Sequence, residues 1–500
     1  MSKEKQGIWN NPLLSSKISS PNVKPPEMLI GYLIGPFGAL LSSGIFTSFL
    51  NQYFTDVLRL DTAFLSGLQL VSTIFIVAAN LIVGQIIERT RTLACKARPW
   101  VLLSALTLSV ASLLMFVVPF EGTAKLVWVA IAYNLYYSVA YPIYNTANST
   151  LIPVSTRNSG QRATLASFTN IAGLGVMGVG SMIFPILVGN VLKTYQTRWF
   201  LVMLGVAIFT ALTIYLQFSF TRERVTEESM SGGAAAEQSA AAPSIGDQLK
   251  AVTSEKWWWI VILFYLAFQW SGAIKNGSMA YFCQWVVDSA DIPGGWGAVQ
   301  TILAILGAIP MAAAAAIVVP LSNKFGKRIV VFAGMVIGVI GGVIAGLGNG
   351  AIIPTAIGVA LKCLGSAPAA YLILAMLADV IDHVEFKHNI RTDGLTMSIY
   401  SSIMVAATPI MNAVFMALLN TNGYDAPPTI PSDATEAVRA EIEAAIAAMS
   451  QNMNTQVAIG VSYIWIETVA YAVCALLMIL WTVEKDLPEE QAAIAARKKD

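Results

Sequence analysis

Long apolar stretches separated by short polar connections dominate this chain of 500 residues. A helix needs roughly 20 apolar residues to cross about 30 Å of hydrocarbon, and twelve stretches come near that length. We predict membrane spans at 28–55, 61–87, 99–120, 125–153, 164–190, 198–220, 257–286, 297–321, 328–348, 351–382, 394–420 and 456–481. The pattern indicates an all-α membrane protein with twelve transmembrane helices.

The composition agrees with a chain that lies mostly in a lipid bilayer. Hydrophobic residues make up 56% and charged residues 12%, whereas a soluble domain carries about 25% charged residues. The formal net charge of +1 argues against nucleic acid as a partner. We expect a monomer whose partners are the bilayer and a small molecule.

Basic residues gather in alternate connections between the spans. The connections rich in Lys and Arg follow spans two, four, six, eight and ten, and the tail ends Arg497-Lys498-Lys499. The opposite connections are poorer in basic residues, with a mild exception at Lys193 and Arg198. By the positive-inside rule, both termini are expected in the cytoplasm, in a bacterial-type cell membrane.

The long connection at 221–255 divides the chain into two sets of six spans. It contains SGGAAAEQSAAAPS, a run of small residues typical of a flexible linker. We predict a cytoplasmic segment 1–27, halves at 28–220 and 256–482, and a cytoplasmic tail 483–500. Basic connections after spans two and eight, GQIIERTRT and PLSNKFGKR, echo each other. Two six-helix halves with a site at mid-membrane define the major facilitator fold.

The extracytoplasmic segment 421–455 is unusually long. Pro427, Pro428 and Pro431 interrupt it, and SDATEAVRAEIEAAIAAM follows with a Ser/Asp cap and helix-forming residues. We predict a short surface helix over the outer mouth. The alternative is a solvated connector without a role.

Four sequence blocks resemble a known family. They are QYFTDV at 52–57, GQIIERTRTLACKARPW at 84–100, KNGSMAYFCQWV at 275–286 and ADVIDHVEFKHNIRTDG at 378–394. With the order of spans, they resemble the glycoside–pentoside–hexuronide:cation symporters, the melibiose permease-like group of the major facilitator superfamily. The resemblance covers most of the chain and implies alternating access.

Neutral residues stand where that family has buried charges. The resemblance places two cation-binding carboxylates at the positions of Ile76 and Asn80, and other charges at Leu40, Ala140, Asn170 and Val405. A sodium site needs several hard oxygen ligands, which these residues do not supply. We therefore expect proton-coupled or uncoupled transport rather than sodium-coupled transport.

Aromatic and amide side chains remain to bind a substrate. The fourth span reads YNLYYSVAYPIYNTANST, and the resemblance places Tyr144 where the family stacks an aromatic ring on sugar. Interhelical packing and hydrogen bonding is the alternative role for such residues. The candidate substrate-binding residues are Tyr141, Tyr144, Asn145, Asn148, Asn80, Asn170, Trp270, Lys275, Asn276 and Tyr281.

Ionisable residues inside a membrane are costly and usually functional. Three lie deep in the spans: Lys275, Lys362 and Glu467. Glu467 is the candidate proton-coupling residue, with an ion pair or hydrogen bond inside the bundle as the alternative. Lys362 is expected to extend towards the outer surface.

Charges at the cytoplasmic span ends form two candidate gates. They are Glu88, Arg89, Arg91 and Arg98 after the second span, and Asp379, Asp382 and Arg391 after the tenth. The alternative is that these charges only set topology and solvate helix ends. Exposed pairs contribute about 0–1 kcal/mol each, so a gate needs several together.

These observations predict a sugar or glycoside transporter with a proton as the candidate coupling ion. A transporter of a lipid or another amphiphile, or a membrane sensor on the same fold, remains an alternative. The sequence contains no phosphate-binding loop, no Cys/His metal cluster and no enzyme motif. We therefore expect no cofactor, no metal and no enzymatic activity.

Overall fold

The structure is a computed structural model that describes residues 15–90, 92, 94–156, 158–230, 245–289, 292–390, 392–431 and 433–497. Within these ranges the regular structure is helical, apart from an isolated β-bridge between Thr92 and Cys95. Each of the twelve predicted segments coincides with helix. Ten of the described helices are long and apolar enough to cross a membrane, and Arg98–Leu114 is a shorter apolar helix. The all-helical membrane architecture is confirmed, and the number of crossings stays a prediction.

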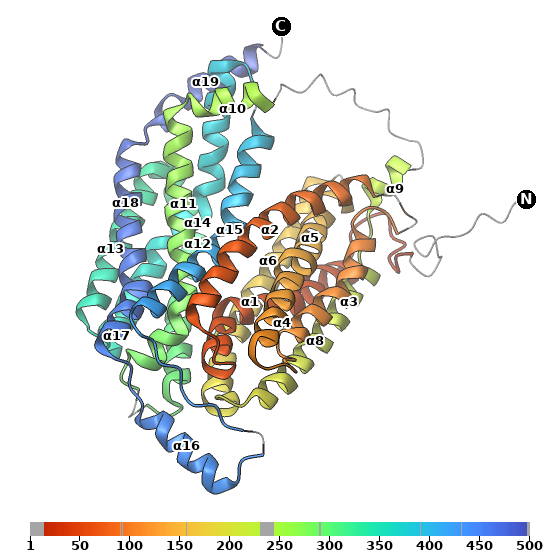
Figure 1. Cartoon of the computed structure of the whole chain (residues 1–500). Coiled ribbons are helices and arrows are strands. Elements are labelled where there is room, and N and C mark those ends of the chain that lie inside the picture. Colours follow the sequence, from red (N-terminus) through yellow and green to blue (C-terminus); the bar gives the residue numbers. More distant parts are fainter. Residues whose placement is uncertain are drawn as a thin grey trace, which may run out of the picture. The chain divides into compact units, whose positions relative to one another are not determined.

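The helices form two compact units, Met1–Gln238 with Ala426–Met449, and Ser239–Asp425 with Ser450–Asp500. Figure 1 shows the first six-span set in red to yellow and the second in green to blue. The first unit contains η3 Glu27–Ile34, α1 Gly35–Gln52, η4 Tyr53–Val57, α2 Thr62–Arg89, α3 Arg98–Leu114, α4 Gly122–Asn134, η5 Leu135–Ala140, α5 Tyr141–Ser155, α6 Ser159–Met182, α7 Phe184–Leu187, η6 Val188–Leu192, α8 Gln196–Ser219, α9 Arg224–Met230 and α16 Glu436–Ala448. The second contains α10 Ile245–Thr253, α11 Lys256–Trp285, α12 Gly295–Phe325, α13 Lys327–Leu347, α14 Ile352–His388, α15 Asp393–Thr421, α17 Met453–Gly460, η7 Val461–Trp465, α18 Ile466–Leu480, η8 Val483–Lys485 and α19 Leu487–Arg497.

Glycines allow α13 and α14 to approach backbone to backbone. A Cβ on Gly341 would lie 2.7 Å from the Gly358 carbonyl oxygen, and one on Gly334 would lie 2.6 Å from the Gly365 carbonyl oxygen. Both distances are shorter than carbon–oxygen contact permits, so these positions require residues without a side chain. Small residues at close helix contacts are the usual packing solution inside membranes.

A buried glutamate caps a distant helix in the first unit. Glu223 follows α8 and is fully buried, and its carboxylate accepts hydrogen bonds of 3.1, 2.8 and 2.7 Å from the backbone N–H groups of Lys96, Ala97 and Arg98. Helix α3 has no side-chain cap of its own, so Glu223 satisfies N–H groups that a helix start leaves free. Burial, the largest influence, raises the pKa of Glu223 above its usual value, although these hydrogen bonds oppose the shift.

The second unit repeats this arrangement. Glu484 follows α18 and accepts hydrogen bonds of 2.8 and 3.2 Å from the backbone N–H groups of Lys327 and Arg328 at the start of α13. The Arg328 guanidinium donates to the Met478 and Ile479 carbonyls of α18. Helix pairs α3–α8 and α13–α18 are therefore joined at one end by equivalent contacts, which supports the predicted internal duplication.

In the described residues, five π-helical turns interrupt the long helices, at η3, η4, η5, η6 and η7. A π turn shifts backbone bonding from i→i+4 to i→i+5 and often marks a functional site. The turn η7 leads directly into the α18 residue Glu467. The irregular backbone of η7 therefore lies next to a charged residue inside a predicted span.

The predicted helix in segment 421–455 is present as α16. Its cap is Thr435, whose hydroxyl accepts from the Val438 N–H at 3.5 Å, rather than the predicted Ser/Asp pair. Ala426–Met449, which contains α16, belongs to the first unit although the flanking helices belong to the second. Glu443 attaches it there through Lys193 at 2.9 Å and the Tyr195 hydroxyl at 3.0 Å.

Candidate functional site

Three charged side chains meet inside the second unit. The Glu467 carboxylate lies 2.6 Å from the Lys362 ammonium and 3.3 Å from the Lys275 ammonium, and the Tyr471 hydroxyl donates a 2.8 Å hydrogen bond to it. Lys362 is 4% exposed and Glu467 1%, whereas the Lys275 side chain is 25% exposed. We call Lys275, Lys362 and Glu467 the charged triad.

The backbone of η7 helps to hold this triad. Lys275 comes from α11, Lys362 from α14 and Glu467 from the first turn of α18. Two carbonyl oxygens within η7, those of Tyr463 and Ile464, lie 3.4 and 3.3 Å from the Lys362 ammonium and accept from it. Lys362 is therefore paired inside the helix bundle, and the expectation that it extends to the outer surface is wrong.

The triad has one member with capacity for a ligand. The Lys275 ammonium has an ion-pair contact with Glu467 at 3.3 Å, and an ammonium has further N–H donors beyond the one that faces this carboxylate. The indole N–H of Trp270, on the same helix, is buried without a hydrogen-bond partner among the described residues. Polar donors in an apolar setting are the features that orient a small molecule.

The polar stripe of span four divides into accessible and buried residues. Tyr141, Asn145 and Asn148 on α5 are partly exposed, whereas Tyr144 is 1% exposed. The Tyr144 hydroxyl donates to the Gln217 side chain at 3.2 Å, which donates to Asn148 at 2.6 Å. Tyr144 therefore braces α5 against α8 in this conformation, and its ring face is covered.

The other neutral candidates differ in their surroundings. The Asn80 amide donates to the Ile76 carbonyl of its own helix at 2.8 Å, and the Asn170 side chain lies outside the described set. Asn276 is exposed on α11. Tyr281 is fully buried and makes edge-to-face contacts with Phe415 and Tyr424 at centroid distances of 5.1 and 5.6 Å, so its ring packs against two other aromatic rings.

In the first candidate gate, Arg98 makes its hydrogen bonds to a residue of the same unit. The Arg98 side chain is buried, and its guanidinium donates to the Phe218 carbonyl at 3.2 and 3.0 Å. Arg89 is exposed. Arg91 lies outside the described residues, as does the Glu88 side chain. The contact of Arg98 fixes α3 to α8, and a gating role stays a prediction.

The second candidate gate also has partners within its own unit. Asp379 pairs with Lys327 of α13 at 2.5 Å, and Asp382 accepts from Gln491 of α19 at 2.9 Å. Arg391 lies outside the described residues. These contacts brace the cytoplasmic end of α14, as predicted for span ten, against neighbouring helices.

A histidine–glutamate cluster lies next to this second gate. Glu255 contacts Lys387 at 2.8 Å and His388 at 2.7 Å, and His383 contacts Glu490 at 2.8 Å. Burial opposes ionisation of Glu255, but hydrogen bonds from Lys387 and His388 outweigh it and hold the pKa of Glu255 below its usual value. Lys387, which lies in the same block 378–394 as Asp379 and Asp382, therefore has Glu255 as its ion-pair partner.

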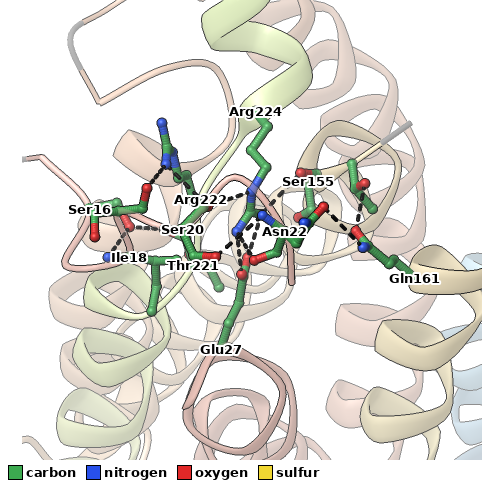
Figure 2. Close-up of polar contacts among 12 residues, drawn as sticks. Ser16, Ile18, Ser20, Asn22, Glu27, Ser155, Gln161, Thr221, Arg222 and Arg224 are labelled. Carbon is green, nitrogen blue, oxygen red and sulfur yellow. Dashed lines mark hydrogen bonds and ion pairs between the residues drawn. The ribbon is translucent and has the colours of Figure 1, made fainter. Parts of the chain in front are cut away.

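Figure 2 shows a polar network that ties the first described residues to the end of α8. Arg224 pairs with the fully buried Glu27 at 2.7 Å. Its guanidinium also donates to the Ser155, Ser20 and Asn22 carbonyls at 3.2, 3.1 and 3.2 Å. In the sequence, Arg224 is one of the basic residues that follow span six and predict its cytoplasmic side. The acidic residue directly after Pro25-Pro26 was the available signal for its partner.

A basic cavity of about 840 Å³ lies beside Ala426–Met449 within the first unit. Its charged lining residues are Arg59, Lys125, Arg198, Arg439 and Asp433. Arg59 donates to the Ala426 carbonyl at 3.3 Å. Lys193 and Arg198 are the basic residues in an otherwise base-poor connection. Lys193 attaches Ala426–Met449 through Glu443, and Arg198 lines the cavity. None of the predicted substrate-binding residues lines this cavity.

Comparisons with known proteins identify related chains. The family model described as MFS/sugar transport protein matches residues 31–485. An isoprimeverose transporter of Lactiplantibacillus pentosus is 26% identical, over 94% of this chain and 91% of that protein. A putative 2,3-dihydroxypropane-1-sulfonate exporter of Escherichia coli K12 is 23% identical, over 74% and 78%. The nucleoside transporter NupG has a similar fold, with a TM-score of 0.58 at 11% identity over 92% of this chain and 100% of that one.

Proposed function

Because the chain belongs to the MFS/sugar transport protein family, we propose that it moves a sugar, a glycoside or a related polyhydroxylated solute across the cell membrane by alternating access. It is a transporter rather than an enzyme. The expected family resemblance is confirmed by the family match and by the relatives. Their names include a sugar, isoprimeverose, and a dihydroxylated sulfonate. The observation that carries the proposal is a charged triad within otherwise neutral, aromatic and amide-bearing spans.

Uptake into proteoliposomes tests this function directly. Purified protein would be reconstituted with internal unlabelled solute, and exchange of radiolabelled monosaccharides, glycosides and sugar acids would be followed. Saturable exchange of at least one solute above that of protein-free liposomes is expected. Absence of exchange for every solute, with protein shown to be folded and inserted, would contradict the proposal.

Sodium should not drive this transport. The two family carboxylate positions are Ile76 and Asn80, and the Asn80 amide bonds its own helix. The carboxylate of the triad is occupied by two lysines. We expect solute affinity to change less than about twofold when millimolar sodium replaces choline at constant ionic strength. A clear rise in affinity with sodium would show that another oxygen site exists. Coupling to a proton, or no coupling, is the proposal.

Accessible residues of α5 are proposed to contact the solute. Tyr141→Ala is expected to weaken solute binding roughly tenfold to a hundredfold, the loss of one buried interaction. Tyr144→Phe is the matched control, because it removes only the hydrogen bond to Gln217. Its affinity should stay within about threefold of the parent. Equal losses in both variants would place the solute on Tyr144 instead.

We also propose twelve crossings, two six-helix halves and cytoplasmic termini for a monomeric protein. Single cysteines at Thr253 and Val438, both exposed, test this orientation in a background lacking the four native cysteines. An impermeant maleimide added to intact cells should label the cysteine at 438, and the cysteine at 253 only after lysis. Labelling of 253 from outside would reverse the orientation.

A further inference from the structure

The charged triad contains the Asp, Glu, Lys and Arg residues that lie deep in the predicted spans. Lys275, Lys362 and Glu467 are the only Asp, Glu, Lys or Arg residues that lie more than one helical turn inside a predicted span. Both histidines, His383 and His388, lie outside the predicted spans. Two ammonium groups and one carboxylate leave an excess of one positive charge. No other acidic residue lies that deep in the predicted spans.

The geometry identifies which lysine carries the excess. Lys362 has the shorter ion pair at 2.6 Å, two backbone carbonyl partners and 4% exposure. Lys275 has the longer contact at 3.3 Å and a side chain 25% exposed. Glu467 and Lys362 therefore form the inner pair. Lys275 presents the remaining charge on the accessible side.

An unbalanced charge in a low-dielectric setting is unfavourable unless a group of opposite charge binds next to it. The polar residues predicted for binding elsewhere are neutral tyrosines and asparagines, which suit hydroxyl groups. An ammonium with free donors suits an oxyanion, because charge-assisted hydrogen bonds are the stronger kind. The two residue types together match a solute that carries hydroxyl groups and one negative charge.

We propose that the transported solute is an anion, a sugar or polyol that bears a carboxylate or sulfonate, and that Lys275 contacts its charged group. This inference rests on the proposed transport function and names its substrate class. Lys275 is the specificity-determining residue, and the Glu467–Lys362 pair positions it. Binding of the anion brings the total charge of the triad and solute to zero.

The test uses matched solutes that differ at a single carbon. Glucose is compared with glucuronate, galactose with galacturonate, and glycerol with 2,3-dihydroxypropane-1-sulfonate, in exchange assays with the full chain in proteoliposomes. The parent should favour the anionic member of at least one pair by tenfold or more. Lys275→Gln should reduce that preference by roughly tenfold to a hundredfold, the loss of one charge-assisted hydrogen bond. Lys275→Arg, which keeps the charge, should retain most of it.

Lys275→Gln is expected to fold, because it removes the excess charge and leaves the neutral Glu467–Lys362 pair. Its melting temperature in detergent should equal or exceed that of the parent. Transport that favours the neutral member of every pair would overturn the inference while the transport function stands. An anion preference that survives Lys275→Gln unchanged would also overturn it. Failure to transport any solute would contradict the proposed function itself.

Discussion

Glu467→Gln is expected to destabilise the protein by about 3–5 kcal/mol, the usual cost of removing one partner from a buried ion pair. The substitution leaves Lys362, at 4% exposure, without a carboxylate. The two carbonyl oxygens of η7 would be its remaining partners. Thermal and denaturant unfolding of the purified protein in detergent would measure the loss.

A second substitution separates this cost from a general packing defect. Glu467→Gln combined with Lys362→Met removes both members of the inner pair, and should recover at least half of the lost stability. The four proteins of the double-mutant cycle isolate the coupling between the two residues. If Glu467→Gln unfolds within about 1 kcal/mol of the parent, the triad is not an ionised cluster.

Removing the buried cap of α3 should be the next largest effect. Glu223→Ala leaves three backbone N–H groups without their acceptor, and we expect a loss of about 2–3 kcal/mol. Glu484→Ala removes two equivalent bonds from α13, and a smaller loss of about 1–2 kcal/mol is expected. Unfolding midpoints of the two variants, compared side by side, test this ranking.

Glu227→Ala supplies the matched control for Glu223. Glu227 also follows α8 but pairs with Arg222 at a partly exposed position, where its side chain is 36% exposed. Exposed pairs contribute at most about 1 kcal/mol. A loss for Glu227→Ala as large as that for Glu223→Ala would show that the whole segment after α8, rather than the cap, stabilises the unit.

The spans and the family were accessible to sequence reasoning because each depends on local information. The predicted span 328–348 is uncharged after Arg328, and its hydropathy alone locates α13 without reference to any other helix. The four sequence blocks, among which 84–100 and 378–394 are the most specific, likewise indicate the family from short segments of sequence. Hydropathy, however, does not predict which helices touch, so the roles of the two candidate gates stay predictions. The number of crossings also stays a prediction, because ten described helices are long and apolar enough to span a membrane and Arg98–Leu114 is shorter.

The pairing of the triad depends on three helices that are distant in sequence. Lys275 and Glu467 are separated by nearly two hundred residues, and each was noticed only as an isolated costly charge. Lys362 was expected to extend towards the outer surface. Instead, the π turn η7 offers it two carbonyl oxygens inside the bundle, and no residue pattern in 461–465 predicts this turn.

The Glu223 cap was missed although the sequence contains a signal for it. The segments FTRER at 220–224 and WTVEK at 481–485 share the order aromatic, Thr, any residue, Glu, basic. This match lies at corresponding places after spans six and twelve. Comparison of the two halves residue by residue would have found it, whereas comparison of basic connections alone found only the weaker echo.

The π turn η7 also determines the directions in which the side chains of α18 point around the helix axis. Each residue of an α-helix turns the chain by about 100° around its axis. A π turn accommodates one extra residue, so every side chain beyond it points in a direction offset from that of a continuous α-helix. Deleting one residue from 461–465 would let the segment close into a regular helix and rotate either Glu467 away from Lys362 or α17 away from its packing. The charged triad therefore depends on the rotation of α18 relative to α17 around the helix axis. This rotation is set by the number of residues in 461–465, and no side-chain substitution can reproduce it.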